Sequence, residues 1–176
     1  MNATKITLRP IVEADLTAMG GMLNDPDALG EFQWYGWGDP ERFRRRWAEH
    51  GLLSEEQWVF AVAGDAGEFL GFVAASRKGA RPTAPYWSIG VQLLPQARGR
   101  GIGTTAQRLL VDYLFAHTPV MRLEADTEAG NLAEQRVLEK LGFTREGVHR
   151  AMAFRDGQWR DMVYYSLLRT DPRPWQ

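Results

Sequence analysis

Three glycines alternate with two arginines in one short segment of the chain. Gly99, Gly101 and Gly103 are separated by single residues, and Arg98 and Arg100 flank the first of them. Glycines at the start of a helix let the backbone approach an anion closely, and the free N–H groups and the helix dipole then attract it. Arginine side chains add charge-assisted hydrogen bonds of about 1.5–3 kcal/mol each. The spacing predicts a cradle for a phosphate or diphosphate; the alternative is a glycine-rich turn with two solvated arginines.

Three common glycine motifs do not fit this segment. A P-loop ends in Gly-Lys-Ser or Gly-Lys-Thr, and the segment contains no lysine. The dinucleotide fingerprint G-x-G-x-x-G needs a wider second interval than the G-x-G-x-G spacing found here. An Arg-Gly tract that binds RNA would be longer and disordered. The spacing therefore favours a different kind of anion-binding turn.

An apolar strand and an amphipathic helix are expected to position this turn. Residues 86–94 are strongly apolar, and from 101 to about 117 apolar residues recur every three or four positions. The rest of the chain alternates strand and helix signals, which predicts one mixed α/β sheet in a single domain, residues 1–176. The other expected strands are 5–9, 58–63, 69–76, 122–127, 143–154 and 159–168, and the other expected helices are 12–23, 40–50 and 131–141.

Composition narrows the class of protein. The chain has 176 residues, of which 44% are apolar and 24% are charged, and its net charge is -1. These values are typical of a globular domain and give no general attraction to nucleic acid or to an anionic membrane. The absence of cysteine excludes a thiolate nucleophile and a cysteine zinc site. Because the chain shows no apolar leader and no run of about 18 apolar residues, we expect a cytoplasmic protein that uses no membrane and no metal.

Four motifs in register resemble one family. Residues 96–103, Gln-Ala-Arg-Gly-Arg-Gly-Ile-Gly, resemble the loop that binds the diphosphate of acetyl-CoA in the GNAT superfamily of N-acetyltransferases. Asn131 followed by residues 137–143 looks like the second half of that family's core. The segments 6–15 and 156–167 are similar to the ribosomal-protein acetyltransferase (RimJ/RimL) branch. Together the motifs cover most of the chain in the order that the family shows.

The resemblance implies an α/β (α+β) GNAT fold, with a mixed sheet of about six to seven strands, splayed strands 4 and 5, and about four flanking helices. Acetyl-CoA would bind in the splay as co-substrate. Val91 and Leu93 would pair with its pantetheine amides, and the N–H of Leu93 or of Leu94 would point at the thioester oxygen. Asn131 would bond the pantetheine arm, cap a helix, or do both. The expected diphosphate ligands are Arg98, Gly99, Arg100, Gly101, Ile102, Gly103 and Thr104.

The sequence departs from the family where a catalytic acid and base are expected. Glu134 stands where the RimJ/RimL branch usually carries a serine near the CoA sulfur, and Leu138 stands where other branches place a tyrosine acid. Trp87 occupies a strand position at which several members hold a catalytic glutamate. Glu134 is therefore either a local acid or an exposed glutamate on a helix face. Ser88 and Asp126, on the two splayed strands, are polar candidates for catalysis, and a structural role is the alternative for each.

The acceptor side is expected to be aromatic and basic. The resemblance places it among the first two helices, their connecting loop and the last hairpin. Trp34, Tyr35 and Trp37 lie in that loop, where they either line the pocket or anchor the loop. Trp87 would limit the size of the acyl group, and His149 is a candidate to face the acceptor. The second helix presents either a solvated basic face or a site for an acidic acceptor or partner, through Arg42, Arg44, Arg45 and Arg46.

These features together predict an enzyme that transfers an acetyl group from acetyl-CoA to a primary amine by direct attack, without a covalent enzyme intermediate. Deprotonating a lysine amine at pH 7 costs about 4.6 kcal/mol, against about 1 kcal/mol for an α-amine. A site without a strong base therefore favours the α-amine of a protein N-terminus or a small-molecule amine of low pKa. The alternatives are an acyltransferase for a longer acyl-CoA and a non-catalytic acyl-CoA-binding module. The protein is expected to be a monomer or a homodimer.

Overall fold

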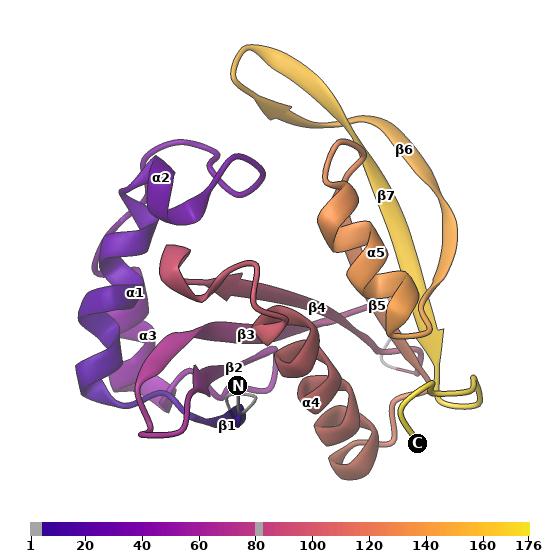
Figure 1. Cartoon of the computed structure of the whole chain (residues 1–176), viewed down its shortest axis with the longest axis horizontal. Coiled ribbons are helices and arrows are strands. Elements are labelled where there is room, and N and C mark those ends of the chain that lie inside the picture. Colours follow the sequence, from indigo (N-terminus) through magenta and orange to yellow (C-terminus); the bar gives the residue numbers. More distant parts are fainter. Residues whose placement is uncertain (1–4, 80–82) are drawn as a thin grey trace.

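The structure is a computed structural model that describes residues 5–79 and 83–176. These residues contain one seven-stranded sheet, in the order β1-β2-β3-β4-β5-β7-β6, together with the helices that pack on it (Figure 1). Neighbouring strands are antiparallel, except that β4 and β5 are parallel. The strands are β1 Thr7–Pro10, β2 Gln57–Ala63, β3 Phe69–Lys78, β4 Tyr86–Leu93, β5 Arg122–Glu128, β6 Thr144–Arg155 and β7 Gln158–Leu168. The helices are η1 Glu13–Asp15, α1 Leu16–Leu23, α2 Pro26–Leu29, α3 Arg42–His50, η2 Pro95–Ala97, α4 Ile102–His117 and α5 Leu132–Lys140.

The two parallel strands separate soon after they meet. Their pairing is confined to Trp87 with Leu123 and Ser88 with Glu124, and β4 continues to Leu93 without a partner on that side. Figure 1 shows β1–β4 with α1–α3 on one side of this splay and β5–β7 with α5 on the other. The expectation of a mixed sheet with splayed strands 4 and 5 is therefore confirmed.

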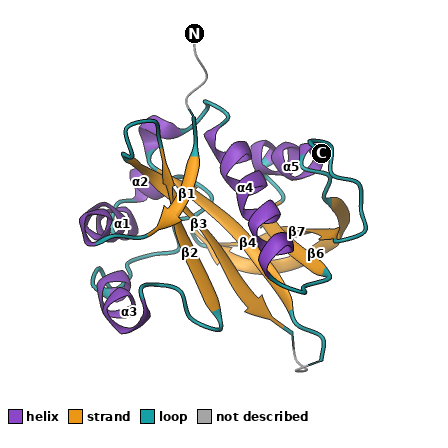
Figure 2. Ribbon diagram, turned by 90° about the horizontal axis from the view of Figure 1, so that it is seen from below, coloured by secondary structure: helices purple, strands orange, loops and turns teal. Residues whose placement is uncertain are grey.

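Helices cover both faces of the sheet (Figure 2). On one face, Leu110 and Leu114 of α4 are fully buried against a cluster that includes Ile89 of β4 and Leu123 of β5. Burying each such leucine contributes about 1.5–3 kcal/mol. On the other face, α1 and α3 enclose a second apolar cluster, in which Phe43 is buried. Because strand side chains alternate between faces, β4 and β5 present their other residues to the side of α1 and α3.

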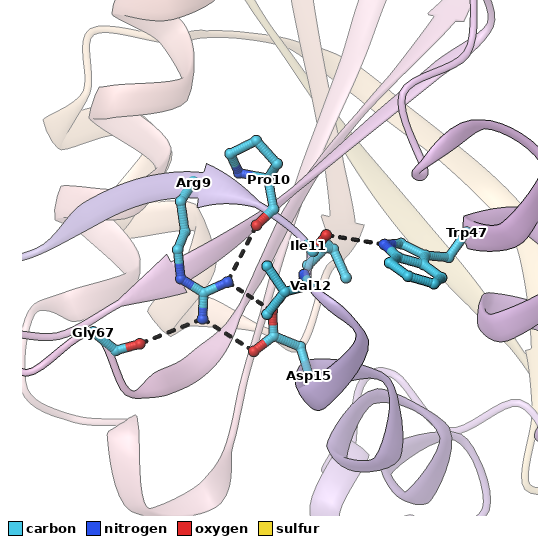
Figure 3. A network of polar contacts seen from close by, with 7 residues as sticks. All are labelled: Arg9, Pro10, Ile11, Val12, Asp15, Trp47 and Gly67. Atoms are coloured by element: carbon cyan, nitrogen blue, oxygen red, sulfur yellow. Dashed lines mark hydrogen bonds and ion pairs between the residues drawn. The ribbon is translucent and has the colours of Figure 1, made fainter.

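A polar network ties the end of β1 to the helices that follow it (Figure 3). Arg9 donates to both carboxylate oxygens of Asp15, at 2.7 and 3.0 Å, and to the carbonyl oxygen of Gly67 at 3.3 Å. Burial alone would raise the pKa of Asp15, but the Arg9 hydrogen bonds and charge outweigh it and lower that pKa. The Trp47 indole N–H donates to the Ile11 carbonyl at 3.0 Å. These contacts fix α3 beside the sheet.

The elements expected from the sequence agree with those found, with three local differences. The helix expected over 12–23 is divided into η1 and α1, and the four-residue helix α2 was not expected. This brings the α-helices of the described residues to five, against the four expected. Strand β6 contains register shifts near Gly147 and between His149 and Ala153, which the apolar pattern does not reveal.

Trp87 lies in the core under α4 and lines neither of the two cavities at the splay. Its side chain is 6% exposed and packs with Trp58 at 4.8 Å between ring centroids, within the cluster under α4. The strand alternation that places Ser88 and Gly90 toward α3 turns Trp87 away from it. The prediction that Trp87 limits the acyl group or contacts the acceptor is therefore wrong, and its role is in the core.

Candidate active site

The edge of β4 that faces the splay offers backbone groups without a strand partner. The N–H of Leu94 donates to the Leu70 carbonyl of β3 at 2.9 Å. N–H groups of an antiparallel strand alternate in direction, so those of Leu93 and Val91 point away from β3 and toward the splay. Leu94 is therefore engaged and does not supply the oxyanion donor considered for it, whereas Leu93 has the required direction.

The glycine-rich turn connects η2 to α4 at the wide end of the splay. Gly99 and Gly101 have φ values of +70° and +75°, which glycine adopts without strain. A Cβ at either position would meet no atom within 4 Å, so both glycines border open space. The first helical N–H that is bonded belongs to Thr105, which donates to the Gly101 carbonyl at 3.1 Å. No described residue accepts a hydrogen bond from the N–H groups of residues 102–104, so these groups remain for an anion, as the first turn of any helix allows.

A cavity of about 460 Å³ occupies the splay. One wall comes from β4 and the glycine-rich turn, and the other from the start of α5. Most of the residues expected to bind acetyl-CoA line it, namely Val91, Leu93, Arg98, Gly99, Gly101, Gly103, Thr104 and Asn131. Ile102 instead places its side chain in the core, at 3% exposure, and Arg100 is exposed outside the cavity lining.

The Arg98 side chain, expected to bind the diphosphate, donates hydrogen bonds to backbone carbonyls of the protein. Its Nε and Nη2 donate to the Leu93 carbonyl at 3.1 and 2.8 Å, and Nη2 also donates to the Ala28 carbonyl at the end of α2. Burial lowers the pKa of its guanidinium. The side chain therefore joins α2 to the end of β4 and shapes the cavity wall, instead of extending toward a diphosphate.

Asn131 caps α5 and lies in the cavity wall. Its Oδ1 accepts the backbone N–H of Glu134 at 3.2 Å, as an N-cap residue does. Its Nδ2 donates to the Thr127 hydroxyl at 3.0 Å. The expected capping role is confirmed, and the same two bonds fix the amide at the edge of the cavity.

Glu134 is half-buried in that wall, so the alternative of an exposed helix-face glutamate is wrong. Its Oε1 accepts from Nε2 of the buried Gln107 of α4 at 2.9 Å. Among the described residues, the Gln107 Oε1 is buried without a hydrogen-bond partner. Burial raises the pKa of Glu134. Only the protonated form of Glu134 carries an O–H that a carbonyl oxygen such as that of Gln107 can accept.

The acidic side chains of β5 lie on the face of the sheet opposite α4. Glu124 and Asp126 alternate with the buried Leu123 and Ala125, so both carboxylates lie on the face of Ser88. Asp126 is exposed at the surface, but desolvation by the groups around it is the largest cause that raises its pKa; the nearby charge of Glu124 raises this pKa further, whereas other charged groups oppose the effect. Asp126 stands two residues beyond the last β4–β5 pair and thus at the mouth of the splay.

Two further side chains surround Asp126. Tyr164 of β7 is its partner in the register of β5 and β7, and the His149 ring stacks on Tyr164 at 4.0 Å between centroids. Burial is the largest cause that raises the pKa of Tyr164, and the charge of Asp126 raises this pKa further. The sequence analysis missed Tyr164 and Glu124; the alternation of acidic and apolar residues in β5 could have indicated Glu124.

The loop between α2 and α3 extends toward the β6–β7 hairpin (Figure 1). The Tyr35 hydroxyl donates to Glu128 Oε1 at 3.3 Å, and Glu128 forms a buried ion pair with Arg155 at 2.7 Å. Trp34 packs edge-to-face on Trp37, which is 80% exposed. None of these three aromatic residues lines either cavity at the splay. Tyr35 thus anchors the loop, and the cavity is lined instead by Phe32 and Gln33, which the sequence analysis did not select.

A second cavity of about 360 Å³ adjoins the first across β4. Val91, Gln92 and Gln33 belong to the walls of both cavities. Its other wall residues include Gly90 and residues of α3, which places it on the face of Ser88. A Cβ at Gly90 would meet no atom within 4 Å, so this part of β4 is open. A second molecule can therefore reach the splay from the side opposite α4.

Within residues 5–79 and 83–176 there is no group of three or more His, Asp and Glu residues able to hold a metal ion. No helix in that part of the chain has the length and apolarity needed to cross a membrane.

Comparison with known proteins identifies the fold. The family model for the acetyltransferase (GNAT) domain matches residues 5–144. The chain belongs to the GNAT acetyltransferase family. Its fold superposes on a spermidine N-acetyltransferase from Vibrio cholerae, crystallised with CoA and spermine, with a TM-score of 0.80 at 17% identity over 94% of this chain and 96% of that one.

Two further GNAT relatives are similar in sequence. A probable N-acetyltransferase of Bacillus subtilis, YjcK, is 40% identical over 123 residues, which are 68% of this chain and 66% of that protein. A ribosomal-protein-alanine N-acetyltransferase from Brucella melitensis is 25% identical, with a TM-score of 0.76 over 92% of this chain and 99% of that one. The chain spans slightly less than two thirds of the length of YjcK.

Proposed function

We propose that this GNAT protein transfers an acetyl group from acetyl-CoA to a primary amine, in a complex that holds both substrates. The cavity in the splay carries the proposal, because it joins the free N–H groups of residues 102–104 to the backbone edge of Val91 and Leu93. The first set suits a diphosphate and the second suits the amides and thioester of a pantetheine arm. The CoA-bound Vibrio cholerae structure of the same fold supports this use.

Asp126 is the proposed general base. It lies at the mouth of the splay on the face of the second cavity, where an amine approaches the thioester from the side opposite α4. Desolvation and the Glu124 charge raise its pKa, which makes its carboxylate a better proton acceptor. Because an α-amine costs about 1 kcal/mol to deprotonate at pH 7 and a lysine amine about 4.6 kcal/mol, the proposed acceptor is an α-amine or another amine of low pKa.

Glu134 is the proposed general acid. It lies in the wall of the first cavity on the first turn of α5, beside Asn131. Burial favours its protonated form by raising its pKa, and this effect outweighs the hydrogen bond from Gln107 Nε2, which lowers that pKa. That proton would pass to the thiolate that leaves when the C–S bond breaks, while the amine nitrogen forms the new amide bond.

We also place the protein in the ribosomal-protein acetyltransferase branch. The motifs at both ends of the sequence and the likeness to the Brucella melitensis enzyme support this branch. The acceptor would then be the α-amine of a protein N-terminus, with small-molecule amines as the alternative.

The test is release of free CoA thiol with two matched peptides. One has a free N-terminus and no lysine, and its twin has a blocked N-terminus and one lysine. We expect the first to be acetylated at least about tenfold faster at pH 7, because less free energy is needed to remove its proton. Faster acetylation of the blocked twin would refute the α-amine preference. Binding of CoA without turnover on any amine would show an acyl-CoA-binding module instead.

A further inference from the structure

The second cavity has an unusual distribution of charge. Two arginines of α3, Arg42 and Arg46, lie in its wall, four residues apart and hence on one face of the helix. No aspartate or glutamate is among its wall residues. The remaining polar wall consists of the amides of Gln33, Gln57 and Gln92. The cavity is therefore cationic, although the chain as a whole carries a net charge of -1.

The four arginines of α3 divide into two pairs by their partners. Arg44 forms ion pairs with Glu13 and Glu41 at 3.4 Å, and Arg45 forms one with Asp39. In the part of the chain that the structure describes, the Arg42 guanidinium lies over the Phe43 ring at 5.1 Å and forms no ion pair within 4 Å, although, after the hydrogen bond from Arg45, its charge contributes to the lowered pKa of Asp39.

Arg46 is half-buried, and its side chain has no hydrogen bond or ion pair with any residue that the structure describes. A half-buried guanidinium without an anion is unfavourable unless water or a ligand satisfies its five donors. The two arginines that face the cavity are thus the two that the protein leaves without a carboxylate.

The floor of the cavity holds the two arginines in position. Phe43, between them in sequence, is buried and packs edge-to-face on Phe72 of β3 at 5.6 Å. The Trp47 indole fixes the next turn of α3 to the Ile11 carbonyl. The basic face therefore points toward Gly90 and the splay because of packing, and does not depend on a mobile segment.

We propose that the acceptor is a primary amine that carries a carboxylate, which Arg42 and Arg46 bind while the amine reaches the splay beside Asp126. This rests on the proposed acetyl transfer and specifies its substrate class. The arginines bind the anion through charge-assisted hydrogen bonds, which are stronger than neutral ones. The same pair repels a polycation such as a polyamine, so this chain differs in acceptor from its spermidine-acetylating structural neighbour.

The carboxylate can belong to a free amino acid or to an acidic side chain at the N-terminus of a peptide. The test therefore compares three acceptors with the wild-type protein: the peptide amide Glu-Ala-Ala, its twin Gln-Ala-Ala, and free glutamate, with spermidine as the cationic reference. We expect kcat/KM for the acidic peptide, for free glutamate or for both to exceed that of the neutral twin by at least about tenfold. Preference for the peptide or for glutamate identifies the source of the carboxylate.

Matched variants assign the preference to the cavity. Arg46→Met and Arg42→Met keep an apolar stem and remove the charge, so the preference for the acidic acceptor should fall to about twofold or less. Arg44→Met, whose parent side chain is paired with Glu13 and Glu41, should leave it unchanged. Because Arg42 is exposed, its replacement is compatible with folding, which a thermal melt verifies.

Two outcomes separate this inference from the proposed function. Acetylation of the acidic peptide, free glutamate and the neutral peptide at equal rates, or preference for spermidine, would overturn the anion site and leave acetyl transfer intact. Calorimetric binding of the acidic peptide and of free glutamate to the CoA-loaded protein gives a readout without turnover. Affinity for either acidic acceptor at least about tenfold above that for the neutral twin, lost in Arg46→Met, supports the site even if no amine is acetylated, and equal affinities for all three refute it.

Discussion

Replacing Glu134 by Gln separates its proposed catalytic role from its structural cost. The variant keeps a carbonyl oxygen that can accept from Gln107 Nε2, which lies 2.9 Å from Glu134 Oε1 in the wild type. It removes the carboxyl proton that Glu134 would supply to the leaving thiolate. General acid catalysis typically contributes 10²–10⁴-fold. We therefore expect kcat to fall by at least about 100-fold, with the KM for acetyl-CoA changed by less than about threefold.

The same variant changes stability in a direction fixed by the pKa of Glu134. Burial raises that pKa above its ordinary value of 4.5, so the folded state binds more protons than the unfolded state above pH 4.5. The unfolding free energy of the wild type then falls with rising pH, by up to about 1.4 kcal/mol per pH unit, until the pH passes the folded-state pKa. Glutamine does not titrate, so the variant avoids this loss.

Thermal melts from pH 4 to pH 8 measure the difference. For a domain of this size, 1 kcal/mol corresponds to about 2–4 °C in Tm. The Tm of Glu134→Gln relative to wild type should therefore rise by about 3–6 °C per pH unit just above pH 4.5 and then level off. Gln158→Ala, at an exposed position of β7, serves as the control and should show a constant difference, because neither residue titrates. A constant difference for Glu134→Gln, or an unchanged kcat, would refute the reasoning.

Four other substitutions test the remaining parts of the site and the core position of Trp87. Asp126→Asn should lower kcat/KM by at least about 100-fold, since it removes the base. Glu124→Gln removes a negative charge that, after desolvation, is the next largest cause of the raised pKa of Asp126. The acid limb of the pH–rate profile should therefore move to lower pH. An unmoved limb would show that Asp126 is not the group that titrates in the profile. Gly90→Val fills open space and should raise the acceptor KM at least about tenfold while the calorimetric Kd for CoA stays constant; a weaker CoA affinity would show that this face is not the acceptor side. Trp87→Phe should lower the unfolding free energy by about 1–3 kcal/mol without altering acyl-chain selectivity, and a new preference for longer acyl-CoA would contradict its core position.

The sequence predicts best where backbone conformation determines function. Gly99 and Gly101 require positive φ, and the helix that follows them supplies N–H groups, so their pattern alone indicates an anion site. The cap formed by Asn131 is equally local, because it binds the N–H three residues later. The β4–β5 splay follows from the family resemblance and from the few residues that pair.

The sequence predicts poorly where a side chain chooses among distant partners. Arg98 binds the Ala28 carbonyl, 70 residues away, which no local pattern reveals. Glu134 looks like an exposed helix residue until α4 places Gln107 against it. Trp87 faces the core because of the strand's register, and the family resemblance gave no indication of that face. Arg42 and Arg46 differ from their neighbours only through the carboxylates that surround α3.

Calorimetric titration with CoA, phosphopantetheine and pantetheine tests most directly whether the N–H groups that follow Gly101 bind the diphosphate of CoA. Phosphopantetheine differs from pantetheine only by the first phosphate of that diphosphate, so it should bind at least about tenfold more tightly, since each charge-assisted hydrogen bond to the phosphate contributes about 1.5–3 kcal/mol. Equal affinities for phosphopantetheine and pantetheine, or no heat with CoA, would contradict the account.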